Sequence, residues 1–188
     1  MRKLLVPIFC SVILQPICLS QAASKLSPRV KAYVNVDAPV VALTRVRVID
    51  GTGAAARTEQ TLVISNGMIS ALGDASSTKI PDGAKVMDFS GHTLIPGLVG
   101  MHDHMYYPAP GGVTATYPEH AASFPVLYLA NGVTSIRTTG SVETYTDLEL
   151  KHAIDEGKEV GPKINVTGPY LEGQGAFVLQ MHKLRDAE

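Results

Sequence analysis

The chain has 188 residues, of which 45% are hydrophobic and 18% charged, with 16 basic and 17 acidic side chains. These values are typical of a folded globular protein and exclude wholesale disorder or a collagen-like fibre. The net charge of −1 comes without a basic stripe, so the chain is not expected to bind nucleic acid. Its length suits one ordinary domain but falls short of the roughly 250 residues of a complete (β/α)₈ barrel.

The chain begins with the pattern of a secretory signal peptide. A short basic start precedes an apolar run over Leu4 to Leu19, and small residues lie before a cut after Ala22. The run is interrupted by Pro7 and Pro16 and is shorter than the roughly 20 apolar residues of a membrane-spanning helix. We therefore expect a signal peptide at residues 1–22, a periplasmic or secreted protein, and no membrane anchor after cleavage.

Both cysteines, Cys10 and Cys18, lie within this segment. The exported protein is therefore expected to have no disulfide and no thiolate ligand, so a metal site must use histidines and carboxylates. The following residues, 23–39, are polar and contain two prolines, and we predict that they form a linker.

Residues 40–90 are predicted to form a small β domain of four short strands. Val46 and Val48 alternate with arginines, as is typical of a half-buried strand. Asn66-Gly67 joins two β-prone runs, and this pair is the strongest short hairpin signal because a two-residue turn needs positive φ at both positions. A further strand is predicted over residues 84–89, so that the four would form one antiparallel sheet.

After residue 90 the predicted elements become longer and alternate between strand and helix. The expected order is strand, helix, strand, helix and strand, within residues 94–100, 118–131, 133–137, 146–156 and 163–167. This order indicates an α/β fold of parallel βαβ units.

The candidate metal-binding residues are His102 and His104, which end a predicted strand after a Gly- and Pro-rich approach. Because successive side chains of a strand point to opposite faces, the two imidazoles should share one face and Asp103 the other. Neutral imidazole suits Zn²⁺, and parallel α/β folds assemble their sites at the carboxyl ends of the strands. Two histidines cannot complete a zinc site, and alone they are equally compatible with two surface histidines.

Residues 88–104, with the sequence DFSGHTLIPGLVGMHDH, resemble the amidohydrolase superfamily at the segment that leads into its first barrel strand and metal-binding histidine pair. Residues 48–53 and 64–69 agree with this resemblance. Residues 130–140 and 161–168 resemble the second and third barrel strands of imidazolonepropionase- and Xaa-Pro-dipeptidase-like members.

The resemblance implies a partial TIM-like barrel of about three strands, preceded by part of a small β-sandwich. Residues 40–90 would belong to the sandwich domain, and residues 91–188 would form the first βα units of an incomplete barrel. The implied activity is hydrolysis of C–N bonds in non-peptide amides, cyclic amides or dipeptides by metal-activated water. The resemblance also implies a divalent metal, Zn²⁺ above others, as one or two ions.

Only the histidine pair of the family's ligand set can be carried over, onto His102 and His104. The family's bridging lysine, its further histidines and its general-base aspartate are expected beyond residue 188, so no catalytic residue is assigned and the chain alone is expected to be inactive and poorly stable. Two positions depart from the family pattern, since Gly100 and Thr138 stand where relatives often have aspartate. Neither position is needed for metal ligation.

Several other polar residues are weaker candidates. Four histidines are expected to be solvated or locally bonded rather than ligands: His92, His120, His152 and His182. Tyr106 and Tyr107 are expected to pack within their loop rather than line a pocket. Glu172 has nothing to distinguish it from a surface carboxylate, and Lys183 lies too close to the third strand to be the bridging lysine.

The alternative interpretation is a secreted β-rich binding module without catalysis. It leaves the histidine pair and the three family-like strands unexplained. The sequence leaves open the substrate, the number of metal ions and the oligomeric state.

Overall fold

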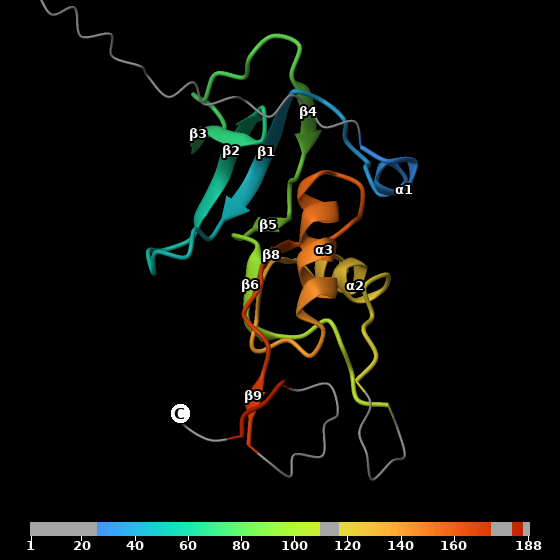
Figure 1. Ribbon diagram of the computed structural model, residues 1–188. Helices are drawn as coiled ribbons and strands as arrows, with labels where there is room; N and C mark the ends of the chain where they lie inside the picture. Colours follow the sequence, from blue (N-terminus) through green and yellow to red (C-terminus); the bar gives the residue numbers. More distant parts are fainter. Residues whose placement is uncertain (1–25, 110–116, 174–181, 186–188) are drawn as a thin grey trace, which may run out of the picture.

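The computed structural model describes residues 26–109, 117–173 and 182–185 (Figure 1). The predicted signal peptide at residues 1–22 lies outside the described residues, so cleavage and export stay predictions. A five-stranded sheet lies at one end of the molecule, and a three-stranded sheet with two helices follows it. A small pair of strands lies at the opposite end. The described part is therefore a mixed α/β fold.

The five-stranded sheet has the order β3-β2-β1-β4, with β5 also paired to β1. Its strands are β1 (Val40–Val48), β2 (Arg57–Ser65), β3 (Met68–Asp74), β4 (Lys85–Asp88) and β5 (Thr93–Leu94). The first three strands are antiparallel. Asn66 and Gly67 turn between β2 and β3 with φ of 50° and 77°, which confirms the predicted hairpin.

The prediction of a wholly antiparallel sheet is wrong at β4, which runs parallel to β1, and the sheet gains a fifth strand, β5, which was not predicted and is also parallel to β1. A two-residue turn forces its strands to be antiparallel. The connection over residues 75–84 is longer and returns the chain to the free edge of β1 in the same direction. Apolar side chains of β1 and β2 form the core of this sheet, namely Ala42, Val46, Val48, Leu62 and Val63.

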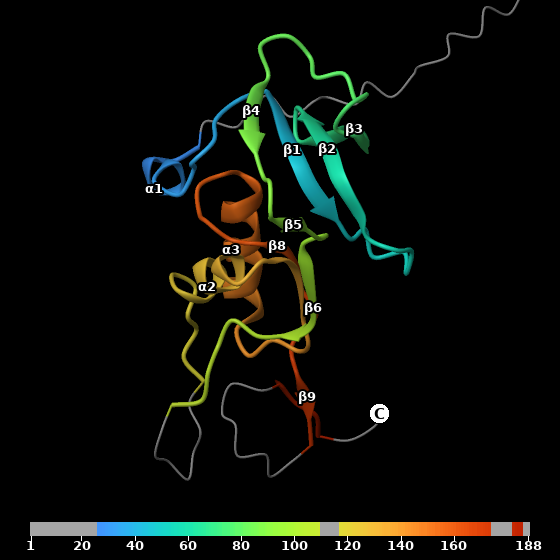
Figure 2. The same ribbon diagram turned by 180° about the vertical axis from the view of Figure 1, so that it is seen from behind.

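The second sheet is parallel, as the alternation of strands and helices predicted. Its order is β6 (Leu98–Asp103), β7 (Val133–Thr138) and β8 (Lys163–Asn165). Helix α2 (Phe124–Ala130) connects β6 to β7, and α3 (Thr144–Asp155) connects β7 to β8. Both helices lie on the same face of this sheet, as the views from opposite sides show (Figures 1 and 2).

One hydrophobic cluster joins this sheet to its helices. Met105, Ile136, Leu150 and Ile164 are buried at its centre, with partly buried aromatic and aliphatic side chains packed around them. Burial of each such side chain stabilises the fold by roughly 1.5–3 kcal/mol. The cluster therefore packs the end of β6, where the histidine pair lies, against β7, β8 and α3.

The other side of β6 is not covered in the described part of the chain. Leu98, Val99 and Met101 are 50%, 61% and 65% exposed, and β6 pairs with a strand on one edge only among the described residues. The three strands form an open sheet, so closure into a TIM-like barrel stays a prediction.

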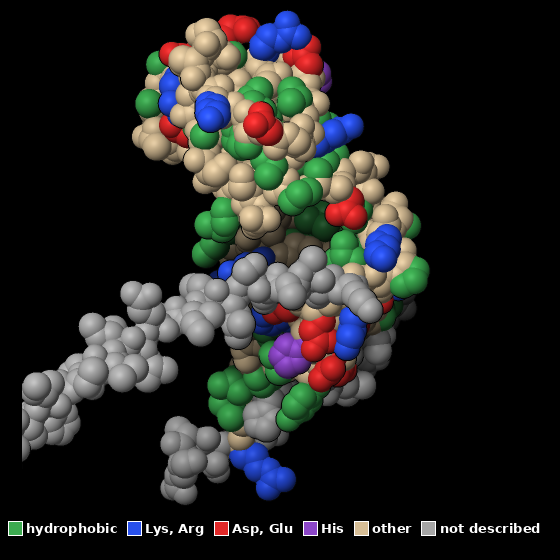
Figure 3. Space-filling model, turned by 90° about the horizontal axis from the view of Figure 1, so that it is seen from above, with side chains coloured by type: hydrophobic (Ala, Val, Ile, Leu, Met, Phe, Trp, Pro, Cys, Tyr) green, Lys and Arg blue, Asp and Glu red, His purple; other side chains and the backbone are tan. Residues whose placement is uncertain are grey.

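Short elements complete the fold. Within the predicted linker, α1 (Pro28–Lys31) is capped by Ser27, whose hydroxyl also donates to the Lys158 carbonyl after α3. β9 (Leu171–Glu172) and β10 (His182–Lys183) form a parallel pair. No helix in the described ranges combines the length and hydrophobicity needed to cross a membrane. Basic and acidic side chains are interspersed on the face seen from above (Figure 3).

Candidate functional site

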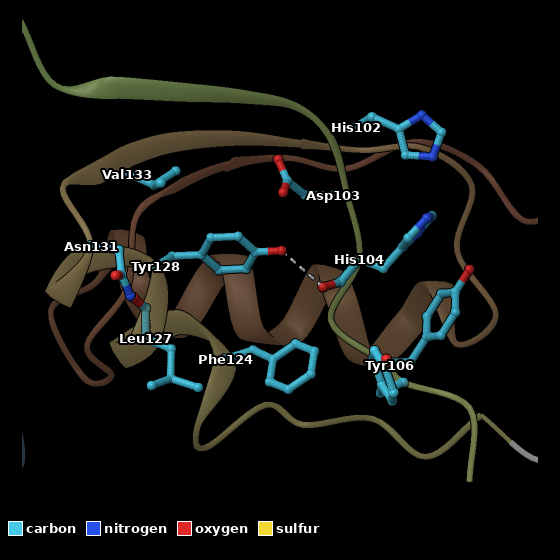
Figure 4. Close-up of a pocket in the computed structure, with 10 residues that line it drawn as sticks. His102, Asp103, His104, Tyr106, Phe124, Leu127, Tyr128, Asn131 and Val133 are labelled. Carbon is cyan, nitrogen blue, oxygen red and sulfur yellow. Dashed lines mark hydrogen bonds between the residues drawn. The ribbon is translucent and has the colours of Figure 1, made fainter. Parts of the chain in front are cut away.

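The two predicted metal ligands lie together at the carboxyl end of β6. The ring centroids of His102 and His104 are 5.3 Å apart, with the rings nearly perpendicular at 87°. Figure 4 shows both imidazoles on one side of the chain and the Asp103 carboxylate on the other. The shared face that strand alternation predicted for the pair is therefore confirmed, whereas the metal role stays a prediction.

A β-bulge precedes the pair. Gly100 is opposite Ile136 and Asp103 is opposite Thr138, so three steps along β6 match two along β7. The extra residue brings positions 100 and 103 to the same side of the strand. A Cβ atom on Gly100 would lie 1.8 Å from Asp103 Oδ2, which no real structure tolerates. Any side chain at position 100, where the sequence departs from the family pattern, would therefore force the Asp103 carboxylate to shift.

His104 is the more enclosed of the two histidines. Its backbone carbonyl accepts a hydrogen bond of 3.3 Å from the Tyr128 hydroxyl, drawn as a dashed line in Figure 4. Its buried Nδ1 makes no hydrogen bond with the described residues. Burial lowers the pKa of His104, an effect that the backbone of Gly140 partly opposes. The ring is therefore neutral near pH 7, which is the form that binds a metal ion.

A groove of about 530 Å³ runs along β6 and α2 beside the pair. Its lining combines the segment around the histidines with one face of α2: His102, Asp103, His104, Tyr106, Tyr107, Phe124, Leu127, Tyr128, Asn131 and Val133. The expectation that Tyr106 and Tyr107 only pack within their loop is wrong, because both line this groove. The sequence could not show this, since the groove forms only when α2 packs beside β6.

An acidic cluster lies where the loop after β6 approaches α3. Asp147 in the first turn of α3 is 2% exposed, and both carboxylate oxygens of Glu119 are buried without a hydrogen bond to the described residues. Burial, followed by the charges of Asp147 and Glu143, raises the pKa of Glu119 to about 7. Sequence reasoning missed this cluster because its members lie on separate elements and an acidic residue in a first helical turn is ordinary.

The weaker candidates are not brought to the site. His92 packs edge-on against Phe89, with 5.4 Å between ring centroids, and its Nδ1 is 3.1 Å from the Ser90 carbonyl, so the predicted local bonding is confirmed. His120 stacks on Phe124, with 4.7 Å between ring centroids, and His152 is exposed at the end of α3.

The residues near the end of the chain differ from the expectation in one respect. Glu172 is half-buried in β9, and its Oε2 atom is buried without a hydrogen bond to the described residues, so it is not an ordinary surface carboxylate. Its strand neighbour in β10 is Lys183, which is exposed. The side chain of His182 lies outside the described part of the structure.

The histidine pair fits a metal ion only as part of a ligand set. Nowhere in the described ranges do three or more His, Cys, Asp or Glu side chains converge in a metal-binding arrangement. Zinc normally takes three or four protein ligands at structural or catalytic sites. His102 and His104 therefore supply two donors with suitable chemistry, and further ligands are needed to complete the site.

The fold is shared with solved structures of hydrolases, although no family model and no curated protein matches the chain. A candidate prolidase from Bifidobacterium longum is 28% identical, with a TM-score of 0.59 over 74% of this chain and 33% of its own. A Xaa-Pro dipeptidase with methionine bound in its active site is 23% identical, with a TM-score of 0.62 over 72% and 35%. Phenylurea hydrolase B is 24% identical, with a TM-score of 0.56 over 70% and 31%.

These matches assign the class of fold. About 72% of the chain shares the fold of solved prolidase, Xaa-Pro dipeptidase and amidohydrolase structures, in agreement with the resemblance of residues 88–104. The chain spans about a third of the length of the solved structures that it matches.

Proposed function

We propose that His102 and His104 are two ligands of a divalent metal ion, with Zn²⁺ favoured, in an exported amidohydrolase that cleaves C–N bonds. The observation that carries this proposal is the pair of imidazoles 5.3 Å apart at the carboxyl end of β6, inside an amidohydrolase-type fold. The candidate substrates are dipeptides and amide-like small molecules, because the similar structures include a dipeptidase and phenylurea hydrolase B.

The residues of this chain would bind the metal ion and orient its ligands, and they would not transfer the proton. A bound metal ion of this kind lowers the pKa of water to about 7 and polarises the scissile carbonyl. His104 enters the site as a neutral donor because burial lowers its pKa. The Tyr128 hydroxyl fixes the backbone at His104, and the groove beside α2 offers an apolar wall to a small ligand.

Export is the second part of the proposal. It is supported by the basic start, the apolar run and the small residues before Ala22. If the segment is a signal peptide, the protein recovered from the periplasm or medium should begin at Ala23, as its N-terminal sequence would reveal. A protein that retains residues 1–22 in the cytoplasm would contradict export.

Metal binding is tested by titrating the chain with Zn²⁺ in a calorimeter and measuring the metal content after dialysis. His102→Ala and His104→Ala should each weaken binding by roughly tenfold or more, because each removes a ligand. His152→Ala is the matched control, since His152 is exposed on α3 outside the groove. Equal zinc affinity in all four proteins would overturn the metal role and favour a binding module without catalysis.

A further inference from the structure

We infer that Tyr106, which follows β6, and Tyr170, which follows β8, are positioning residues that hold the imidazole of His104 in place. The inference concerns the orientation of the imidazole. It rests on the proposed function only in supposing that this orientation serves metal binding.

The two phenol rings flank the imidazole. Tyr106 lies 4.7 Å from His104 between ring centroids, at an interplanar angle of 35°, and Tyr170 lies 6.3 Å away at 37°. Tyr117 packs edge-on against Tyr106 at 5.3 Å. Ring contacts of this kind restrict how far the imidazole can rotate.

The hydroxyl groups form a chain with a defined direction. Tyr106 donates to the Tyr170 hydroxyl at 2.9 Å, and Tyr170 donates to the Thr139 backbone carbonyl at 2.6 Å. Both phenolic protons are therefore used within the protein, so neither tyrosine can donate to a ligand unless the chain of hydrogen bonds breaks. This use of the protons favours a positioning role over a role in substrate binding.

The Tyr170 ring packs directly against the backbone of Gly140, a position that favours glycine. Gly140 has φ of 84°, and a Cβ atom there would lie 2.3 Å from Tyr170 Cε1. The Tyr170 backbone N–H donates to the Ser141 carbonyl at 3.2 Å, and the Ser141 N–H donates to Gly168 at 3.2 Å. The ring and the backbone of Tyr170 are thus both fixed to the segment that follows β7.

Thr138, the second departure from the family pattern, anchors the same segment. It is 0% exposed, and its Oγ1 accepts a hydrogen bond of 2.8 Å from the Thr167 backbone N–H. Thr167 Oγ1 in turn accepts one of 2.8 Å from the Gly140 N–H. Hydrogen bonds of Thr138 and Thr167 therefore join the ends of β7 and β8 next to Gly140, against which Tyr170 packs. Tyr170 is in turn hydrogen-bonded to Tyr106, which contacts the His104 ring.

The test compares Tyr170→Phe, which keeps the ring and removes the hydroxyl, with Tyr145→Phe as a matched control. Tyr145 is 85% exposed on α3. The first readout needs no metal: the NMR chemical shifts of the His104 ring protons, with those of His92 and His152 as internal references. Tyr170→Phe should shift the His104 signals alone, and Tyr145→Phe should shift none of them.

The second readout is zinc affinity, which should fall by about tenfold in Tyr170→Phe, in the range known for groups that orient metal ligands. Gly140→Ala should reproduce both effects, whereas Gly132→Ala should not, since Gly132 also has positive φ but its added Cβ meets nothing within 4 Å. If Gly140→Ala fails to fold, Tyr170→Phe alone decides.

The two readouts separate the inference from the proposed function. Unchanged His104 shifts in Tyr170→Phe would overturn the inference even if the wild-type chain binds zinc. Altered shifts in a chain that binds no zinc would support the positioning of His104 and show that the histidine pair needs its further ligands to bind the ion. Altered shifts with unchanged zinc affinity would overturn the statement that the orientation serves metal binding.

Discussion

The five-stranded sheet and the βα part of the molecule differ in how their buried polar side chains are satisfied. Gln60 in β2 is 3% exposed, and its Nε2 donates to the Thr58 carbonyl and the Asp74 carboxylate, each at 2.9 Å. In the described part of the chain, all buried side-chain polar atoms without a hydrogen bond belong instead to the βα part, in Asp103, His104, Glu119, Ser141, Thr144, Asp147 and Glu172.

The difference separates the five-stranded sheet from the part of the chain that holds the candidate site. A buried polar atom without a partner costs roughly 1–3 kcal/mol, so a fold that keeps several in one place gives up stability there. These atoms belong to the segments around the carboxyl ends of β6, β7 and β8, where parallel α/β proteins assemble their sites. Their distribution therefore coincides with the region of the histidine pair, to which His104 itself belongs.

The largest expected effect tests the tight packing at the bulge of β6. Gly100→Ala should lower the free energy of unfolding by about 2–3 kcal/mol, because the added Cβ collides with the Asp103 carboxylate. Urea unfolding would measure the loss. Gly168→Ala is the control, since its added Cβ meets nothing within 4 Å.

Removing the Asp103 carboxylate should reverse the loss of stability caused by Gly100→Ala. Asp103→Gly introduced into the Gly100→Ala chain should recover most of the lost stability. A Gly100→Ala protein as stable as the wild type would show that Asp103 moves aside without cost.

The second prediction concerns the satisfied polar group of the sheet. Gln60→Ala should cost about 1–2 kcal/mol of unfolding free energy, because it removes two hydrogen bonds from a buried position. Lys79→Ala, at an exposed position of the same region, should change stability by less than about 0.5 kcal/mol. Equal stability of these two variants would remove the contrast between the regions.

The third prediction concerns Glu119, whose substitution should stabilise the chain, whereas the two substitutions above destabilise it. Its pKa rises from 4.5 to about 7 on folding, so between these values the folded chain holds a proton that the unfolded chain releases. The free energy of unfolding should therefore fall as pH rises from 4.5 to 7, by about 1–2 kcal/mol after allowance for solvent screening.

Glu119→Gln isolates this contribution. The variant should lose that part of the pH dependence and be about 1 kcal/mol more stable than the wild type at pH 8. Thermal unfolding from pH 4.5 to 8 would measure both effects. Wild-type and variant curves of the same slope would show that Glu119 ionises normally in the folded chain.

The smallest expected effect concerns an exposed ion pair of the sheet. Arg57 Nη2 lies 3.6 Å from Asp50 Oδ2, and the two side chains are 47% and 36% exposed. Arg57→Ala should change stability by less than about 0.5 kcal/mol, and the difference should vanish at 1 M salt. A larger effect would mean that stability in the sheet also depends on specific electrostatic contacts.

The sequence predicted the features that depend on local patterns. The Asn66-Gly67 hairpin and the strand–helix alternation after residue 90 follow from residues close together in the chain, and the structure confirms both. The common face of His102 and His104 follows from strand periodicity in the same way.

The features that the sequence could not predict arise from contacts between distant segments. The parallel direction of β4 depends on where the 75–84 connection returns, and the bulge depends on the register between β6 and β7. Tyr170 approaches Tyr106 across 64 residues of chain, and no periodic pattern connects them.

The bulge of β6 also constrains how this sequence can change over generations. The Asp103 carboxylate fills the space in which any side chain at position 100 would begin. Replacement of Gly100 forces the Asp103 carboxylate to shift, whereas replacement of Asp103 by a smaller residue causes no such clash. We therefore expect the effects of substitutions at the two positions to depend on each other, with loss of Asp103 the easier first step. Among relatives, an acidic residue at position 100 should accompany a small residue at position 103.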